Sequence, residues 1–356
     1  MDDTVNRKSG HGNAGLRRCV RANEPRRSTR RALLIALGAG ALAAPLASFA
    51  QQPAKVWRIG YLDLGSRQFS LDAGRQAAFL QGMRERGYAE GKHFVFEVRY
   101  ADGHSDRLDG LAAELVRLKA DIILTIGNPA SHAAQRATTG IPIVVVAAAD
   151  PVRDGFAESL ARPGGNITGL SSGSGEIVQK WVELLITMAP KLSRVAVLLN
   201  PANSAHSHMQ LSVQTALRRT GRQVLPVSAR SPDDMERGFA AMARERADAL
   251  IILPDSAFTS QRKQIAALTL KHQLPSMSQG LTFPEVGGLM AYGFEINDSL
   301  RQAATFVDKI LKGAKPGDLP FEQPTRYYFV INRKTAKALG LTIPQELLLR
   351  ADKVIE

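Results

Sequence analysis

The chain contains one structural unit twice, and this duplication limits the folds that it can adopt. The first copy centres on the apolar run Ala120–Ile126 and the second on Ala247–Leu253. In each copy the run follows a helix-like segment that ends in a basic residue, and it stops abruptly at small or polar residues. Short, almost continuous apolar runs that alternate with helical segments indicate βαβ units in a parallel sheet covered on both faces.

The similarity of the two copies extends upstream of these runs. Arg58–Leu62 matches Arg194–Leu198, and the helix that ends at Arg86–Gly87 matches the one that ends at Thr220–Gly221. The predicted fold class is therefore α/β, with two similar doubly wound parallel-sheet lobes and a hinged cleft between them. A cleft between two lobes is a place where a small molecule binds.

The expected elements alternate along both halves. Strands are expected at Val56–Leu62, His93–Arg99, Asp121–Ile126, Pro142–Ala147, Arg194–Leu199, Gln223–Val227, Asp248–Leu253, Leu274–Met277 and Gly287–Gly293. Helices are expected at Asp72–Arg86, Leu108–Lys119, Pro129–Thr138, Gly175–Met188, Ser204–Thr220, Met235–Arg246, Phe258–His272, Asp298–Lys312 and Arg333–Leu339. We expect an N-terminal lobe over residues 51–170, with a returning segment at about 281–315, and a C-terminal lobe over 171–280, with a C-terminal segment at about 316–356.

Residues 1–50 have the pattern of a leader and signal peptide. Arg30–Arg31 precede the apolar run Ala32–Ala44, which Pro45 breaks. Ser48–Phe49–Ala50 follows, with small residues at the two positions that a signal peptidase reads. This arrangement predicts cleavage near Ala50 and a periplasmic mature chain, because the run is too short and too rich in Gly and Ala for a membrane-spanning helix. Ordinary Sec export and a twin-arginine signal both stay open.

The composition is that of a soluble globular protein without a nucleic-acid-binding surface. Hydrophobic residues make up 44% and charged residues 22% of the chain, which is ordinary. Aromatic residues make up only 6%, and the net charge of +13, part of which lies in the first fifty residues, forms no basic stripe. We therefore expect no nucleic-acid partner. Cys19 is the only cysteine and precedes the apolar run, so the mature chain would contain no disulfide.

Polar residues follow the expected strands, at the sheet edge where ligands of parallel α/β folds bind. The candidate ligand-binding residues of the first half are Ser66, Gly127, Asn128, Ser131 and Asp150. Those of the second half are Asn200, Asn203, Asp255, Ser256, Gln279 and Tyr292. A helix start at Gly127–Asn128 favours a carboxylate, whereas Asp255 suits an ammonium group. Several of these residues are also good helix caps and turn formers, so a capping role stays open.

Catalytic and cofactor motifs are weak in this sequence. His206 and His208 stand two residues apart, on different faces of a helix, and make a poor metal pair. The sequence contains no P-loop, and no Gly-x-Gly-x-x-Gly follows a strand. No nucleophile–base pair is visible. We therefore expect a binding protein without a catalytic site, metal or cofactor.

Several motifs together resemble one protein family. The segment Arg162–Pro163–Gly164–Gly165–Asn166–Ile167–Thr168–Gly169 is similar to its ARPGGNVTG motif. Further similar segments are Leu111–Val116, Ile141–Val144 with Asp150–Pro151, Asn200–Asn203, Lys309–Pro316 and Lys334–Pro344. Over Val56–Glu356 the chain resembles the TrpX-like (ABC_sub_bind) family of ABC-transporter substrate-binding proteins.

The resemblance implies a type I periplasmic-binding fold that delivers a small-molecule solute to the membrane permease of an ABC transporter. Characterised relatives bind aromatic amino acids. They tend to have Asp-Asn-Thr where this chain has Asp255–Ser256–Ala257, and the loop Asp63–Phe69 also departs from the usual Ser/Gly/Pro-rich form. The expected function is an exported receptor that closes on an amino acid or related carboxylate. The alternative is a ligand-sensing input protein for a signalling system.

Overall fold

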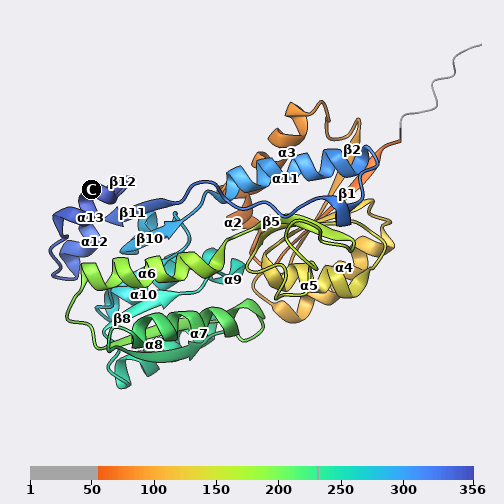
Figure 1. Cartoon of the computed structure of the whole chain (residues 1–356). Helices are drawn as coiled ribbons and strands as arrows, with labels where there is room; N and C mark the ends of the chain where they lie inside the picture. The colour runs from red at the N-terminus through yellow and green to blue at the C-terminus, as the bar shows by residue number, and fades with distance from the viewer. Residues whose placement is uncertain (1–54, 231) are drawn as a thin grey trace, which may run out of the picture. The chain divides into compact units, whose positions relative to one another are not determined.

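Two β-sheets with helices on both faces make up the protein (Figure 1). The structure is a computed structural model that describes residues 55–230 and 232–356. We call the part built on the first sheet the first lobe and the part built on the second sheet the second lobe. Both belong to one unit, Lys55–Glu356. The expected signal peptide lies outside the described residues.

The first lobe contains a five-stranded sheet with the order β2-β1-β3-β4-β5, in which all neighbours are parallel. The strands are β1 (Trp57–Asp63), β2 (Phe94–Tyr100), β3 (Ile122–Ile126), β4 (Ile143–Ala148) and β5 (Ile167–Ser171). The helices are α2 (Arg67–Asp72), α3 (Arg75–Glu85), α4 (Leu108–Arg117), α5 (Gly127–Ala137) and α11 (Ile296–Leu311). Every residue of β3 is buried, because α3 and α11 cover one face of the sheet while α4 and α5 cover the other.

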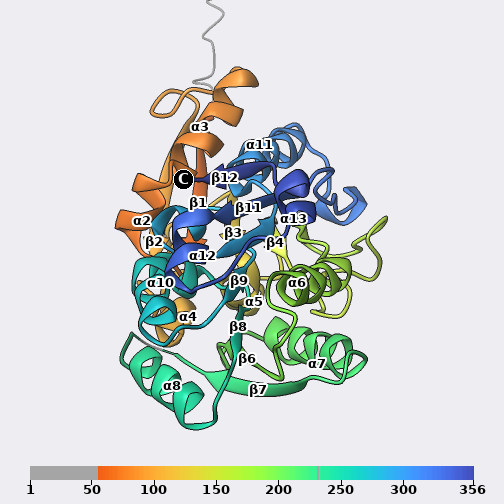
Figure 2. The same cartoon turned by 90° about the vertical axis from the view of Figure 1, so that its left-hand side faces the viewer.

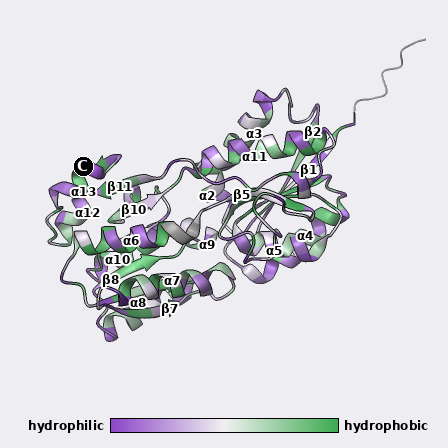
Figure 3. Ribbon diagram, in the orientation of Figure 1, coloured by the Kyte–Doolittle hydropathy of each residue, from purple (hydrophilic) through white to green (hydrophobic). Residues whose placement is uncertain are grey.

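The second lobe contains a seven-stranded sheet with the order β12-β11-β10-β9-β8-β6-β7, and Figure 2 shows it from β12 at the top to β7 at the bottom. The strands are β6 (Arg194–Leu199), β7 (Gln223–Ser228), β8 (Ala249–Ile252), β9 (Ser276–Ser278), β10 (Met290–Gly293), β11 (Tyr328–Asn332) and β12 (Lys353–Ile355). The helices are α6 (Ser174–Met188), α7 (Ala205–Arg218), α8 (Pro232–Arg244), α9 (Ser256–Ser260), α10 (Arg262–Lys271), α12 (Arg333–Ala338) and α13 (Gln345–Arg350). Figure 3 colours β8 as hydrophobic, whereas the outer helices show both colours.

The duplication in the sequence corresponds to a repeated sheet topology. The five parallel strands of the second lobe, β7-β6-β8-β9-β10, follow the same order as β2-β1-β3-β4-β5 of the first. In both sheets the chain order reverses between the first and third strands, which is the switch point at which such sheets bind ligands. The predicted fold class, two similar doubly wound parallel-sheet lobes, is confirmed.

Two of the expected lobe assignments need correction. The segment 281–315 was expected to return to the first lobe, but β10 pairs with β9 in the second sheet, and only α11 packs on the first lobe. Gly293 of β10 lies so close to the Gln279 carbonyl that a Cβ there would overlap it. The C-terminal segment, expected in the second lobe from about residue 316, first follows the first lobe, where the Phe321 N–H donates to the Leu160 carbonyl at 2.8 Å. It joins the second sheet only at β11.

The expected helix at Asp72–Arg86 corresponds to α3 and is preceded by the unpredicted short helix α2, whereas the expected helix at Phe258–His272 is divided into α9 and α10. Gly74, at φ +68°, separates α2 from α3, and Gln261 separates α9 from α10. The added helices α2 and α9 are both capped by side chains, because the Ser66 hydroxyl accepts a hydrogen bond from the Phe69 N–H and the Asp255 carboxylate accepts one from the Ala257 N–H. The sequence patterns did not predict α13 or β12.

The helices of residues 55–230 and 232–356 include none long and apolar enough to cross a membrane.

Candidate ligand-binding site

A cavity lies between the two lobes at the carboxyl ends of their sheets. Leu64 after β1 and Gly127–Asn128 after β3 line it from the first lobe, while Leu253–Asp255 after β8 line it from the second. The cavity encloses about 160 Å³, enough for on the order of ten water molecules. Its position at the switch points of both sheets is that of ligand sites in doubly wound α/β folds.

The first-lobe rim of the cavity offers hydrogen-bond donors. Helix α5 begins at Gly127, which has φ +70°, directly after β3. The Asn128 side chain is 2% exposed, and its Oδ1 accepts a hydrogen bond from the Ala149 N–H at 3.0 Å. Its Nδ2 is buried without a hydrogen-bond partner. An unpaired donor beside a helix N-terminus suits an anionic group, because the first-turn N–H groups of a helix lack intrahelical partners.

The second-lobe rim offers a carboxylate. Asp255 is 6% exposed, and its Oδ1 accepts a hydrogen bond from the Ala257 N–H at 2.9 Å. Its Oδ2 accepts from Asn203 Nδ2 at 3.0 Å and from Asn200 Nδ2 at 3.2 Å. A carboxylate has about four acceptor positions, so one is left for a ligand. Within the described residues no Lys or Arg forms an ion pair with Asp255, and its negative charge is left for a cationic group.

A buried histidine supports this carboxylate. His206 Nδ1 accepts a hydrogen bond from the Asn200 N–H at 2.7 Å, so the proton is on Nε2, which donates to the Pro254 carbonyl at 3.0 Å. Burial lowers the pKa of His206, against the opposing effect of the Asp255 charge. The neutral imidazole therefore fixes the loops after β6 and β8 without neutralising Asp255.

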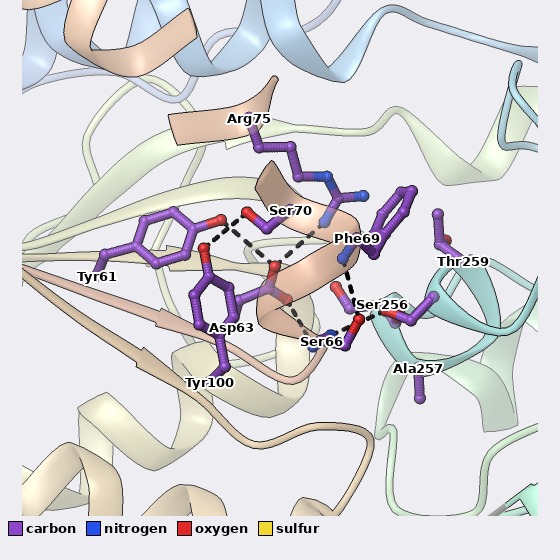
Figure 4. Close-up of polar contacts among 12 residues, drawn as sticks. Tyr61, Asp63, Ser66, Phe69, Ser70, Arg75, Tyr100, Ser256, Ala257 and Thr259 are labelled. Carbon is purple, nitrogen blue, oxygen red and sulfur yellow. Dashed lines mark hydrogen bonds and ion pairs between the residues drawn. The ribbon is translucent and has the colours of Figure 1, made fainter. Parts of the chain in front are cut away.

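A second polar group, also buried, stands at the first-lobe side of the cavity (Figure 4). Asp63 is fully buried, and its carboxylate forms an ion pair with Arg75 at 3.2 Å. It also accepts hydrogen bonds from the Gly65 N–H at 2.9 Å and from the Tyr61 hydroxyl at 3.3 Å. Burial, together with the Asp63 charge, raises the pKa of Tyr61, so the phenol stays a neutral donor. This network fixes the guanidinium of Arg75 beside Phe69.

The lobes touch at the edge of the cavity. The Ser66 N–H of the first lobe donates to Ser260 Oγ of the second at 2.9 Å, and this hydroxyl donates to the Ser256 carbonyl at 2.9 Å. Helix α2 carries Phe69 over this contact, as Figure 4 shows. The ring of Phe69 meets a guanidinium from each lobe, with Arg75 at 4.7 Å and Arg262 at 4.3 Å from its centroid.

The family model of ABC transporter substrate binding proteins matches residues 69–355. The chain belongs to this family. Its proteins bind solutes and are not enzymes.

Three relatives of this substrate-binding protein illustrate the similarity. A conserved domain protein from Vibrio cholerae has 28% identity and a TM-score of 0.78, with 84% of this chain and 100% of that chain covered. An ABC domain from Streptococcus pneumoniae, solved in complex with L-Trp, has 25% identity and a TM-score of 0.77, with 85% and 100% covered. A tyrosine-binding protein from Clostridioides difficile is 24% identical over 273 residues, which are 76% of this chain and 78% of that protein.

The structure brings some of the predicted site residues of the substrate-binding protein to the cavity. Those that line it are Gly127, Asn128, Asn203, Asp255, Ser256 and Gln279. Ser66 does not line it but caps α2 and makes the contact between the lobes. Ligand contact by these residues stays a prediction.

Besides Ser66, four predicted residues do not line the cavity, and their own partners explain why. Ser131 is buried within the first lobe, where its hydroxyl bonds to Thr125 Oγ1 at 2.7 Å and donates to the Gly127 carbonyl at 2.8 Å. Asp150 closes its own turn by accepting from the Arg153 N–H at 3.1 Å.

Asn200 and Tyr292 have supporting positions instead. Asn200 donates to Asp255, as described above, and so helps to fix the position of the carboxylate without lining the cavity itself. The ring of Tyr292 stacks on Tyr327 with centroids 5.8 Å apart, and its carbonyl accepts from Trp181 Nε1 at 2.8 Å. Tyr292 thus belongs to the packing of the second lobe.

Several residues that line the cavity were not predicted. They include Phe69, Arg75, Arg262, Phe294 and Asn297. No local pattern in the sequence marks the two arginines. Each is the first residue of a helix, α3 or α10, in the structure, but each falls inside a helix that the sequence predicts to begin earlier.

Proposed function

We propose that this protein is exported, binds an amino acid or related carboxylate in the cavity between its lobes, and delivers it to the membrane permease of an ABC importer. The signal-like pattern at residues 1–50 supports export to the periplasm. The L-Trp complex of the streptococcal relative and the name of the clostridial tyrosine-binding protein support an amino-acid ligand.

The observation that carries the proposal is the opposite polarity of the two rims. The ligand carboxylate lies at the start of α5, where it accepts from Asn128 Nδ2 and the first-turn N–H groups. The ligand ammonium lies at Asp255, which has an acceptor position left and no cationic partner among the described residues. A hydrogen bond that involves a charged group contributes about 1.5–3 kcal/mol, so the two ends together set the orientation of the ligand.

A large part of the remaining cavity wall is apolar and receives the rest of the ligand. Four phenylalanines, Phe69, Phe258, Phe283 and Phe294, line it together with aliphatic side chains such as Ile252. Apolar walls with a few directed polar groups are usual for small-molecule sites. Burial of the carbon chain or ring of an amino acid here contributes a favourable free energy of about 25 cal/mol for each Å² of apolar surface removed from water.

Binding is coupled to bending of the connections between the lobes. The chain passes between the sheets after β5, after β10 and before β11. The Ser66–Ser260 hydrogen bond forms only when the lobes are together. Such hinged closure over a ligand is a known mode of domain motion.

A thermal-shift screen of the purified protein against amino acids, small carboxylates and aromatic acids tests the proposal. An amino acid should raise the melting temperature in a concentration-dependent way. Asp255→Ala should abolish that response.

Asp248→Ala is the matched control. Asp248 lies directly before β8, whereas Asp255 lies after it. The Oδ2 atom of Asp248 accepts hydrogen bonds from Ser193 and from the Arg194 N–H. It does not line the cavity, so its variant should keep the ligand response even if its melting temperature falls. A full response in Asp255→Ala, or no response of the wild type to any amino-bearing solute, would contradict the proposal.

A further inference from the structure

The cavity contains two guanidinium groups whose charges are compensated very differently. Arg75 begins α3 in the first lobe and Arg262 begins α10 in the second, and both lie over the ring of Phe69. Both line the cavity. The Arg75 charge is balanced by Asp63 at 3.2 Å.

Arg262 has no such partner. Within the described residues no carboxylate lies within ion-pair distance of it, and its Nη1 donates only to the Thr259 carbonyl at 3.3 Å. Its Nε is buried without a hydrogen-bond partner. Burial lowers the pKa of Arg262, and the Arg75 charge lowers it further, yet a guanidinium stays protonated at neutral pH.

Two acidic residues act on Arg262 from beyond ion-pair distance, and each has another hydrogen-bond or ion-pair partner. Asp72 and Glu285 raise the pKa of Arg262. The Asp72 carboxylate accepts from Gln68 Nε2 at 2.8 Å, and Glu285 pairs with Lys353 at 2.7 Å. The half-buried Arg262 therefore has no ion-pair partner within the described residues, and these two carboxylates offset its charge only from a distance.

We propose that Arg262 forms a second anion-binding subsite of the cavity, so that the ligand is an amino acid with an acidic side chain. This inference rests on the proposed function, because it takes Asp255 for the ammonium group and the start of α5 for the first carboxylate. The second carboxylate accepts hydrogen bonds from Arg262. Gln279 Nε2, which also lines the cavity and is buried without a partner, is a further donor for it.

The same subsite links ligand charge to closure of the lobes. The guanidiniums of Arg75 and Arg262, one from each lobe, lie over one aromatic ring, and the Arg75 charge acts against that of Arg262 even though Asp63 pairs with Arg75. An anionic group at Arg262 removes this repulsion. A neutral ligand leaves it in place, so acidic and neutral ligands of the same shape should differ in affinity by about tenfold to a hundredfold.

Isothermal titration calorimetry with isosteric pairs tests this inference. The probes are glutamate against glutamine, and 4-carboxy-L-phenylalanine against 4-carbamoyl-L-phenylalanine, which place the same charge difference at two distances from the amino-acid end. At least one acid should bind about tenfold or more tightly than its amide. In Arg262→Gln this preference should disappear, while the weak binding of the amide is retained.

Arg222→Gln is the matched control, because Arg222 also has a buried unpartnered Nε and donates to backbone carbonyls but lies outside the cavity. It should keep the preference for the acid. Equal binding of acids and amides by the wild type would overturn the inference while leaving the proposed function intact, as would an equal loss of both in Arg262→Gln. If no amino acid of any kind binds, the proposed function fails as well.

Discussion

The contact between α3 and α11 gives a sharp test of how the chain returns to the first lobe. Helix α11 lies against α3 at Gly82, where a Cβ would overlap the Arg301 carbonyl oxygen and approach Ala304 Cβ to 2.9 Å. Gly110, the third residue of α4, is exposed and has nothing within 4 Å of the position of a Cβ. The same substitution at these two glycines therefore has opposite consequences.

Alanine at either position gains about 1 kcal/mol of intrinsic helix stability relative to glycine. Gly110→Ala should keep this gain. At Gly82 the gain is opposed by overpacking against α11, which costs about 1–3 kcal/mol, so the two variants should differ by roughly that amount. The assay is equilibrium urea unfolding of the wild type and of both variants under identical conditions. If Gly82→Ala is stabilised as much as Gly110→Ala, α11 does not pack on α3 as described.

Two further predictions concern buried polar groups. Because burial lowers the pKa of His206 in the folded state, the unfolded chain takes up a proton more readily, and stability should fall as the pH drops below about 6.5, by at most about 1.4 kcal/mol per pH unit for this residue. Urea unfolding between pH 7.5 and about 5.5 should show a smaller slope in His206→Gln, and an unchanged slope would argue against a buried neutral imidazole. Asp63→Asn leaves the Arg75 cation buried without its partner and should cost about 3–5 kcal/mol. Asp109→Asn, which removes an exposed ion pair with Arg136, should change the free energy of unfolding by less than about 1 kcal/mol. Equal losses of unfolding free energy in Asp63→Asn and Asp109→Asn would refute the difference expected between the buried and the exposed ion pair.

The repeated topology was predictable from the sequence because hydrophobic runs record burial directly. The strands around Ala120–Ile126 and Ala247–Leu253 are apolar on both faces, so their alternation with helices fixed the fold class. The short elements α13 and β12 carry too few residues for such a pattern. The position of β10 depends on its pairing with β9 and on the close approach at Gly293, which no local pattern encodes.

The candidate site was predictable to the extent that it follows strand ends. Asn128 and Asp255 stand directly after apolar runs, where the topology of parallel sheets places ligands. Phe69 and Arg262 come to the cavity only because the lobes meet, so their positions depend on tertiary contacts. Tyr292 was predicted to line the site but does not, because a residue at a strand end can still direct its ring into the packing of its own lobe.

The two copies of the repeated unit differ where they face each other. The first ends its third strand in Gly127 and Asn128, which start a helix and offer donors. The second ends it in Pro254 and Asp255, and the carboxylate caps a short helix while keeping its charge. A duplicated lobe thus provides the cavity, and the divergence of a few residues after β3 and β8 provides its polarity.

A crystal structure of the protein grown with the amino acid that gives the largest thermal shift decides where and in which orientation the ligand binds. We expect the ligand between the lobes, with its ammonium group within hydrogen-bond distance of Asp255 and a carboxylate at Asn128 and the start of α5. A ligand bound outside the cavity, or bound inside it with its ammonium group away from Asp255, would refute the proposed binding site.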